Sequence, residues 1–281
     1  MKQYTRITFL SLFILSITYS CVKLDFSEKI PGLSVTLNTD WSLRGENVDI
    51  PSDYIVYMNN EEQRYDKHKD VSLPDYPYGD YFALIYNPAE KVTVEGYKSF
   101  IVDTNEDLEV ATDPEWLFTS SLDVLYDETS RSFTAVMKQQ MRQLNIIVSY
   151  TGENDPIDIE CNISGVASEL ELDFENGDEK YKKSSIARTL LNKNEDGDFV
   201  ASMRLFGIVP SDIQVLNLDI AVSPDHIKNI NENISELVEK FNVDKHIPLT
   251  LVVELDDSFD PIGNSKPKID VHLSIEDWVI E

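Results

Sequence analysis

The amino-acid sequence predicts an all-β protein with one helix, folded as two β-sandwich domains in tandem. Short runs of apolar and aromatic residues, each ended by turn-forming residues, fill the first half of the chain. In the second half, apolar and polar residues alternate with a period of two, which is typical of a sheet with one buried face. A chain of 281 residues, 42% of them apolar, is long enough to form two cores.

The expected strands of the first half are rich in β-branched and aromatic residues and end at Asn, Pro, Gly or Asp. They cover residues 34–37, 54–58 and 81–86, with turns at 59–60, 77–80 and 87–88. The alternating strands of the second half cover residues 144–150, 170–174, 216–222 and 269–275. Trp278 follows the last of these strands, and we expect its side chain to be at least partly buried.

One segment has the spacing of a helix rather than of a strand. Its apolar residues recur every three or four positions, and Pro224-Asp225 supplies a start signal before them. The apolar positions are Ile227, Ile230, Ile234, Leu237, Val238 and Phe241. We expect an amphipathic helix whose apolar stripe packs on the second sandwich or covers a sheet edge.

A polar stretch at residues 127–131 marks the expected division between the two domains. It separates the aromatic segment 114–118 from the strands that begin at Phe133. This division gives a signal peptide at 1–20, an N-terminal β-sandwich at 21–130 and a C-terminal β-sandwich at 131–281.

Cys21 stands at the end of an export signal. Lys2 and Arg6 precede an apolar run at residues 7–17, which is too short to span a bilayer, and Thr18-Tyr19-Ser20 follows it. A cysteine directly after a small residue at this place is the layout of a bacterial lipoprotein, in which that cysteine carries the acyl chains, such as palmitate. We therefore expect a body tethered to a membrane through lipidation of Cys21; the family resemblance given below implies that this is the outer membrane. An ordinary cleaved signal followed by a coincidental cysteine is the alternative.

The charge of the chain excludes some classes of partner. A net charge of −27 and a pI near 4.3 argue against nucleic acid, because phosphate binding needs a basic surface. They also argue against a body that lies on anionic lipid. Cys161, the other cysteine, lies on the apolar side of an alternating run, so we expect a buried, unreactive thiol and no disulfide.

The residue types used in catalysis and metal binding do not form recognisable sites. Residues 192–198 have oxygen-bearing side chains and a glycine at the spacing of a calcium loop, but the twelfth position is Met203 rather than Glu. An Asp-Gly hairpin turn explains the segment with fewer assumptions. The four histidines have no metal-ligand spacing and are His68, His226, His246 and His272. We expect no metal, no cofactor and no enzyme activity.

Four tyrosines near one expected turn offer a different possibility. Tyr76, Tyr78, Tyr81 and Tyr86 would form a platform for stacking sugar rings if they were exposed. Tyrosines on strands more often pack in a core or on a sheet face. A surface lipoprotein that binds glycans therefore stays open as the alternative function.

Scattered aromatic, Pro and Gly positions resemble those of a known family over nearly the whole chain. They are Cys21, Asp40-Trp41, Leu73-Pro74, Tyr78-Gly79-Asp80-Tyr81, Ile85-Tyr86-Asn87, Pro114-Glu115-Trp116-Leu117, residues 137–139, 144–148 and 163–166, and Ile275-Glu276-Asp277-Trp278. The sequence resembles the fimbrillin-like lipoproteins of Gram-negative bacteria, and in particular the anchor and accessory subunits of pili. That resemblance implies two transthyretin-like β-sandwich domains, a place at the cell surface and no catalysis. It also implies contact with pilus subunits by β-strand addition.

One departure from the stalk subunits of such pili favours an anchor or accessory subunit. Between Cys21 and the first strand, the basic residues are Lys23 and Lys29, so a protease that cuts after arginine has no target there. Arg44 comes later, in a loop, where cleavage is conceivable.

Overall fold

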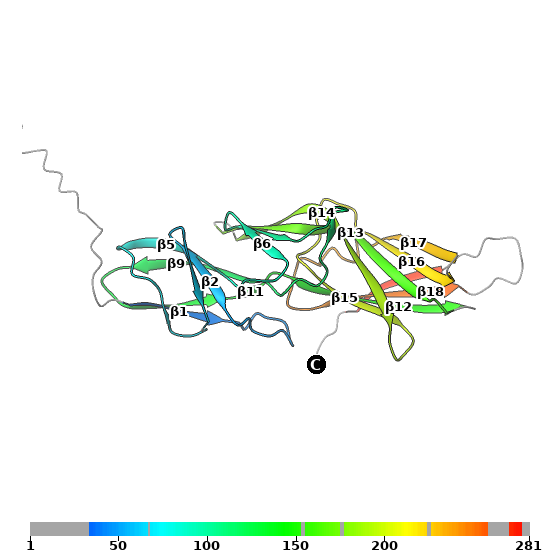
Figure 1. Cartoon of the computed structure of the whole chain (residues 1–281), viewed down its shortest axis with the longest axis horizontal. Helices are drawn as coiled ribbons and strands as arrows, with labels where there is room; N and C mark the ends of the chain where they lie inside the picture. The colour runs from blue at the N-terminus through cyan, green and yellow to red at the C-terminus, as the bar shows by residue number, and fades with distance from the viewer. Residues whose placement is uncertain are drawn as a thin grey trace, which may run out of the picture.

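The computed structural model describes residues 34–66, 68–152, 155–174, 177–223, 226–257 and 270–276. Its strands form two β-sandwiches that lie end to end in an elongated molecule, with the start of the described chain at the far end of the first sandwich (Figure 1). The all-β prediction and the sandwich architecture are confirmed. Within the described ranges, no segment forms a helix that is long and apolar enough to cross a bilayer. Residues 1–20, Cys21 and Trp278 lie outside those ranges, so the predictions made for them stay predictions.

The first sandwich consists of a three-stranded sheet and a five-stranded sheet. The smaller sheet has the order β10(Arg131–Val136), β1(Val35–Asp40), β4(Val71–Ser72). The larger sheet has the order β11(Lys138–Gln139), β9(Phe118–Tyr126), β5(Gly79–Tyr86), β2(Tyr54–Met58), β3(Glu61–Tyr65). β1 is the central strand of its sheet, parallel to β10 and antiparallel to β4. Its burial alternates along its length, with Val35 and Leu37 facing the core.

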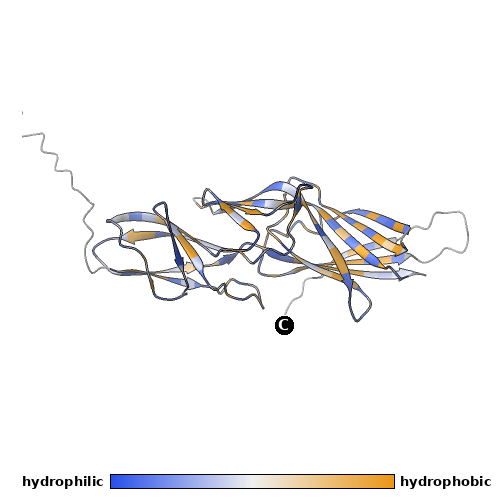
Figure 2. Cartoon of the chain, viewed as in Figure 1, coloured by the Kyte–Doolittle hydropathy of each residue, from blue (hydrophilic) through white to orange (hydrophobic). Residues whose placement is uncertain are grey.

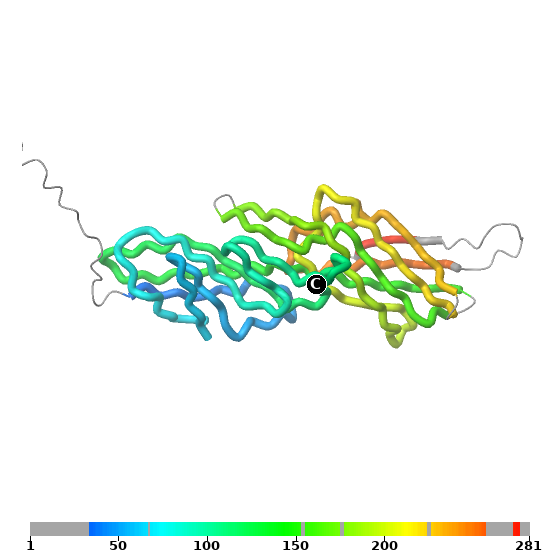
Figure 3. The backbone as a smooth tube through the Cα atoms, turned by 45° about the horizontal axis from the view of Figure 1, so that its top comes forward, coloured from blue at the N-terminus to red at the C-terminus, as the bar shows by residue number. Residues whose placement is uncertain are grey.

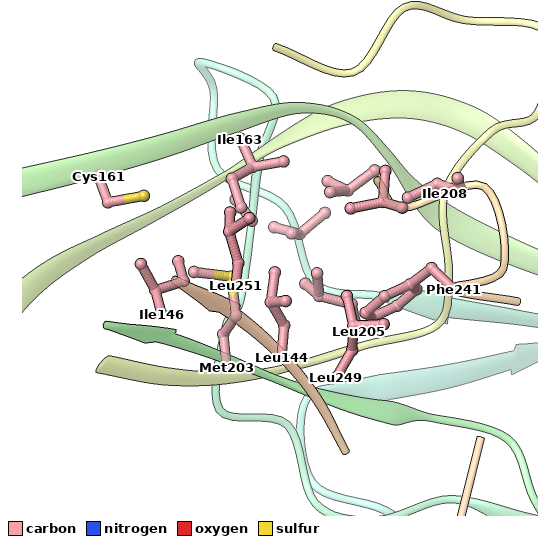
Figure 4. Close-up of a cluster of buried hydrophobic side chains, with 14 of the residues drawn as sticks. Leu144, Ile146, Cys161, Ile163, Met203, Leu205, Ile208, Phe241, Leu249 and Leu251 are labelled. Atoms are coloured by element: carbon pink, nitrogen blue, oxygen red, sulfur yellow. The ribbon is translucent and has the colours of Figure 1, made fainter. Parts of the chain in front are cut away.

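The second sandwich is built from one continuous path of eight strands that folds over on itself. The order is β17(His226–Asn233), β16(Val215–Ser223), β13(Asp158–Asp173), β14(Asp178–Lys193), β15(Phe199–Leu205), β12(Arg142–Gly152), β18(Leu249–Asp257), β19(Asp270–Glu276). Apolar residues alternate with polar ones along these strands (Figure 2), as the sequence predicts. In Figure 4, side chains of β12 and β18 lie across from those of β13: Leu144, Ile146, Leu249 and Leu251 against Cys161 and Ile163.

Three short strands between β5 and β9 leave the first sandwich and join the second. They are β6(Val92–Glu95), β7(Ser99–Val102) and β8(Glu109–Val110). β7 pairs with β13, and β8 pairs with β14, before the chain returns to the first sandwich through β9. Phe100 and Val110 are buried in the core of the second sandwich as a result. The chain therefore crosses between the sandwiches three times.

The β13–β14 hairpin spans both sandwiches in the opposite direction. Each of its strands has 16 residues, and its far end extends over the first sandwich (Figure 3). There the ring of Phe174 packs against Phe82 of β5, with 5.3 Å between ring centroids. The ring of Tyr97, in the β6–β7 turn, stacks on Tyr57 of β2 and ties the same region together.

The expected division after residue 130 falls between β9 and β10. Both strands pair within the first sandwich, as does β11, so the chain passes into the second sandwich after Gln139. Whether the two sandwiches fold independently stays a prediction.

The expected helix is wrong. Residues 226–233 form strand β17, which pairs with β16 along its whole length, and residues 234–248 form a series of turns. Asn229, Asn231 and Asn233 are poor helix formers, and the exposed edge of β16 offers a full ladder of hydrogen bonds instead. The helical spacing arises because Ile230 in the strand and the buried side chains in the turns face the same core.

The buried side chain of Arg142 fixes the position of residues 234–248, which we call the turn segment. Its buried guanidinium donates hydrogen bonds to the backbone carbonyls of Lys240, Phe241, Val243 and Ile247, at 2.7 to 3.3 Å. It also lies 5.5 Å from the centre of the Phe241 ring. Carbonyls buried under a loop need donors, and here one side chain donates to four of them.

Replacing Arg142 by Met should lower the free energy of unfolding by about 3 kcal/mol or more, because several buried carbonyls lose a charged donor. Urea unfolding measures the change. Arg64→Met is the matched control: Arg64 pairs with Asp53 at the surface, so the loss should stay below about 1 kcal/mol. Equal losses in the two variants would contradict the role assigned to Arg142.

Candidate docking groove

A groove of about 1040 Å³ lies where the two sandwiches meet. The loop after β1 contributes Glu46 and Asn47, and the turn segment before β18 contributes the opposite wall. Ile275 of β19 closes one side. Arg142 and Asn145 of β12 also line it. The groove is therefore assembled from four parts of the chain, and we call it the junction groove.

The walls of the junction groove are fixed by buried hydrogen bonds. Gln139, at the end of β11, accepts a hydrogen bond from the backbone N–H of Gly45 at 2.8 Å. Its amide nitrogen donates to the carbonyls of Met141 and Lys245, each at 2.8 Å. One buried amide thus joins the loop after β1 to the turn segment. Arg142 also donates hydrogen bonds to backbone carbonyls of that segment.

The surface of the junction groove is mainly apolar with an acidic rim. Val243 is 55% exposed and Ile247 is 38% exposed, and Leu237 and Ile275 are partly exposed beside them. The rim carries four acidic residues, Glu46, Glu236, Glu239 and Asp244. Exposed apolar side chains rimmed by charge are typical of a surface that binds another protein.

The edge of β19 lies beside this apolar surface. Among the described strands, β19 pairs only with β18, so the backbone groups along its other edge have no strand partner. An unpaired edge is a template for another strand, and apolar side chains of an added strand would need a groove such as this one.

Two other edge strands, β3 and β17, are less suited to strand addition. β3 is a short edge strand whose side chains include Glu61, Glu62 and Arg64, and charges on an edge oppose pairing with a neighbour. β17 exposes Asn229, Asn231 and Asn233, with Ile227 as its main apolar side chain. Neither edge lies beside a groove comparable to that of β19.

Arg44 is held within its own loop. Its guanidinium donates to the carbonyls of Val48 and Trp41, each at 3.1 Å, and the next residue, Gly45, is buried. A protease needs an extended, accessible backbone, and this loop is folded back on itself.

The calcium-like segment is a hairpin turn, as its Asp-Gly sequence predicts. Asn194 and Asp198 pair through backbone and side-chain hydrogen bonds at 2.8 and 2.9 Å, with Gly197 at a φ of +95° between β14 and β15. Within the described part of the chain, no three His, Cys, Asp or Glu side chains gather as metal ligands. His246 lines the junction groove, His68 packs between Trp41 and Tyr54, and His226 and His272 lie on β17 and β19.

The four tyrosines do not form a platform: Tyr76 and Tyr81 pack on the core of the first sandwich, and Tyr86 packs against Phe100 in the core of the second. Tyr86 is buried, and burial together with Glu62, which accepts its hydroxyl proton, raises its pKa. The rings of Tyr76 and Tyr81 contact each other and Tyr126, and burial raises the pKa of Tyr76 to about 12. Tyr78 is only partly exposed, with its hydroxyl buried.

Cys161 is buried in the core of the second sandwich, as expected. Burial raises the pKa of its thiol to about 12, so the reactive thiolate is scarce at neutral pH.

Sequence reasoning missed the junction groove and the groups that hold it. Arg142 gave a weak signal, because it begins an alternating strand in which its own position faces the buried side. Gln139 gave none, since its partners lie 94 and 106 residues away.

The comparisons with known proteins agree with this architecture. The fimbrial anchor protein Mfa2 from Porphyromonas gingivalis is similar in fold, with a TM-score of 0.59 and 11% identity over 87% of this chain and 97% of that one. A candidate adhesin from Bacteroides ovatus has a TM-score of 0.58 and 14% identity over 78% and 89%. A candidate polysaccharide-binding protein from Bacteroides thetaiotaomicron has a TM-score of 0.57 and 12% identity over 80% and 93%.

Structural similarity at such low sequence identity establishes a shared fold, but not a shared function. No curated protein matches the sequence. A sequence profile of the fimbrillin-A associated anchor proteins Mfa1 and Mfa2, however, matches residues 91–281, which is more than half of the chain. This match is to a family of fimbrial anchor proteins, whose place is the cell envelope. The chain therefore belongs to the fimbrillin-A associated anchor proteins Mfa1 and Mfa2.

Proposed function

We propose that this protein is a lipid-anchored subunit that holds a fimbrium to the outer membrane. Acyl chains on Cys21 fix it to the membrane, and the junction groove takes a strand from a fimbrial subunit along the free edge of β19. The observation that carries the proposal is an apolar groove beside an unpaired edge strand, in a chain that belongs to a family of fimbrial anchors. The role is binding, not catalysis.

The position of β1 explains why an anchor would keep its own first strand. Cys21 precedes β1 in the chain, so any lipid on Cys21 is joined to the body through β1. A cut after Arg44 would leave the body held to its lipid only by the pairing of β1 with β10 and β4. A covalent tether therefore requires that this loop stay intact, and its folded-back geometry supports that.

The geometry also separates the tether from the proposed binding site. β1 begins at the far end of the first sandwich, whereas the junction groove lies at the boundary with the second (Figure 1). A fimbrial subunit bound there would be held one sandwich away from the lipid. The glycan-binding alternative has no comparable support, because Tyr76, Tyr81 and Tyr86 pack against other side chains of the protein and do not form an exposed platform.

Thiol counting tests the lipid anchor. Protein isolated from membranes and fully denatured should react with one maleimide per chain, at Cys161, because an acylated Cys21 has no free thiol. Cys161→Ala should give none, and Cys21→Ala should release the folded protein from the outer membrane, since two or more acyl chains are needed for stable anchoring. Two reactive thiols per wild-type chain would contradict the lipid anchor.

Substitution in the junction groove tests the binding site. Val243→Asp combined with Ile247→Asp should weaken binding to purified fimbrial subunits at least about 10-fold, or about 1.4 kcal/mol, because a charge replaces buried apolar contact. Ile213→Asp is the control, since Ile213 is 66% exposed and does not line the groove. Surface plasmon resonance with the immobilised protein measures the change. Unaltered binding by the double variant, with thermal stability preserved, would argue against this groove.

A further inference from the structure

Lys245 is a buried lysine at the junction of the two sandwiches. Its side chain is only 6% exposed, although it lies in the turn segment before β18. The Nζ atom lies 2.7 Å from Oε2 of Glu179 and 3.1 Å from Oε1 of Gln140, and it faces the ring of Tyr181 at 5.1 Å. Lysine is rarely buried to this degree, so the site needs an explanation.

Gln140 is equally buried and is held with its amide turned toward the lysine. It is 2% exposed, and its Nε2 donates to Oγ1 of Thr119 at 2.8 Å. A carbonyl bond is about 1.23 Å long, so the amide carbon Cδ lies within about 4.3 Å of Nζ. Reacting atoms in enzymes are held about 3–3.5 Å apart, so Nζ has to move toward Cδ by no more than about 0.8 Å before it attacks.

Burial favours the loss of a proton from the Lys245 amine, next to a carboxylate that can receive it. Burial lowers the pKa of Lys245, although the charge of Glu179 opposes that shift. Burial acts to raise the pKa of Glu179, but the charge and hydrogen bond of Lys245, together with the hydrogen bond from the Tyr181 hydroxyl, lower it, so Glu179 lies beside the amine as a carboxylate. A neutral amine is a nucleophile, whereas an ammonium is not.

We propose that Lys245 and Gln140 become joined by an isopeptide bond, with Glu179 as the group that carries the proton. The carboxylate takes a proton from Nζ, and the amine attacks Cδ of Gln140. The tetrahedral adduct collapses as the Cδ–Nε2 bond breaks, and Glu179 returns the proton to the departing nitrogen. One amine and one primary amide give one secondary amide and one ammonia, so no oxidant or cofactor is needed.

A cavity next to the amide gives the ammonia a way out. It has a volume of about 250 Å³ and is lined in part by Gln140, Thr119 and Glu179. Glu179 contacts Nζ and also lines this cavity, so its carboxylate borders the space that the ammonia would enter.

The bond would join the chain where it leaves the first sandwich to the turn segment before β18. These two residues are 105 positions apart, and everything between them would be closed into one covalent loop. A mechanical force applied between the lipidated end and the junction groove would then be borne by the cross-link, and strands β12 to β17 would not carry it. The cross-link itself goes beyond the anchoring role proposed above and does not depend on it, whereas this effect on the load rests on that role.

Peptide mapping by mass spectrometry of the full chain tests the bond. The wild-type protein should yield a branched peptide that contains both Gln140 and Lys245, lighter than the sum of its two parts by one ammonia, about 17 Da. Lys245→Arg and Gln140→Met should each abolish the branched peptide. Lys183→Met, which removes an exposed lysine paired with Glu169, should leave it unchanged.

The variant Glu179→Gln tests whether bond formation needs the carboxylate, independently of whether the protein folds. This variant keeps the side-chain shape but cannot accept the proton, so it should stay folded, as judged by circular dichroism, and remain unlinked. A branched peptide in Glu179→Gln would overturn the role of Glu179. Separate, unmodified Gln140 and Lys245 peptides from the folded wild-type protein would overturn the proposal as a whole.

Discussion

The architecture depends on strands that arise in the sequence of one sandwich but pair with strands of the other. β7 and β8 arise between β5 and β9 of the first sandwich, yet they pair with β13 and β14 of the second. The β13–β14 hairpin extends back and packs Phe174 on Phe82 of β5. The second sandwich therefore pairs with strands that arise within the first, and the first is contacted in return by side chains of the β13–β14 hairpin. Without that pairing, the polar backbone groups of β7 and β8 would be unsatisfied.

The junction is held by polar side chains as well as by strands. Gln139 bonds the loop after β1 to the turn segment, Arg142 supports that segment, and Lys245 lies between Glu179 and Gln140. Buried polar groups of this kind are costly unless every one is paired, so they select a single arrangement of the parts that they join. The shape of the junction groove is determined by that arrangement. A binding site assembled from distant segments keeps its geometry only if the segments cannot move apart.

The sequence predicts the strands well and the junction poorly, for one physical reason. Alternation at 144–150 and 216–222 reports which face of a strand is buried, and this is a local property of the chain. The helix expected at 227–241 failed because Ile230 and Phe241 contact one core from a strand and a turn, which gives the same spacing as a helix. The junction groove could not be predicted from the sequence, because Glu46, Val243 and Ile275 come together only in the folded chain. Family resemblance, not periodicity, supplied the anchoring role.

The central claim is that the two sandwiches unfold as one body because they share strands. Differential scanning calorimetry of the full chain tests it most directly. A single transition whose calorimetric enthalpy equals its van't Hoff enthalpy is the predicted result, since losing β7 or β8 from either side disrupts both cores. Two resolved transitions, or a calorimetric enthalpy well above the van't Hoff value, would contradict the claim and mean that the sandwiches are separate folding units.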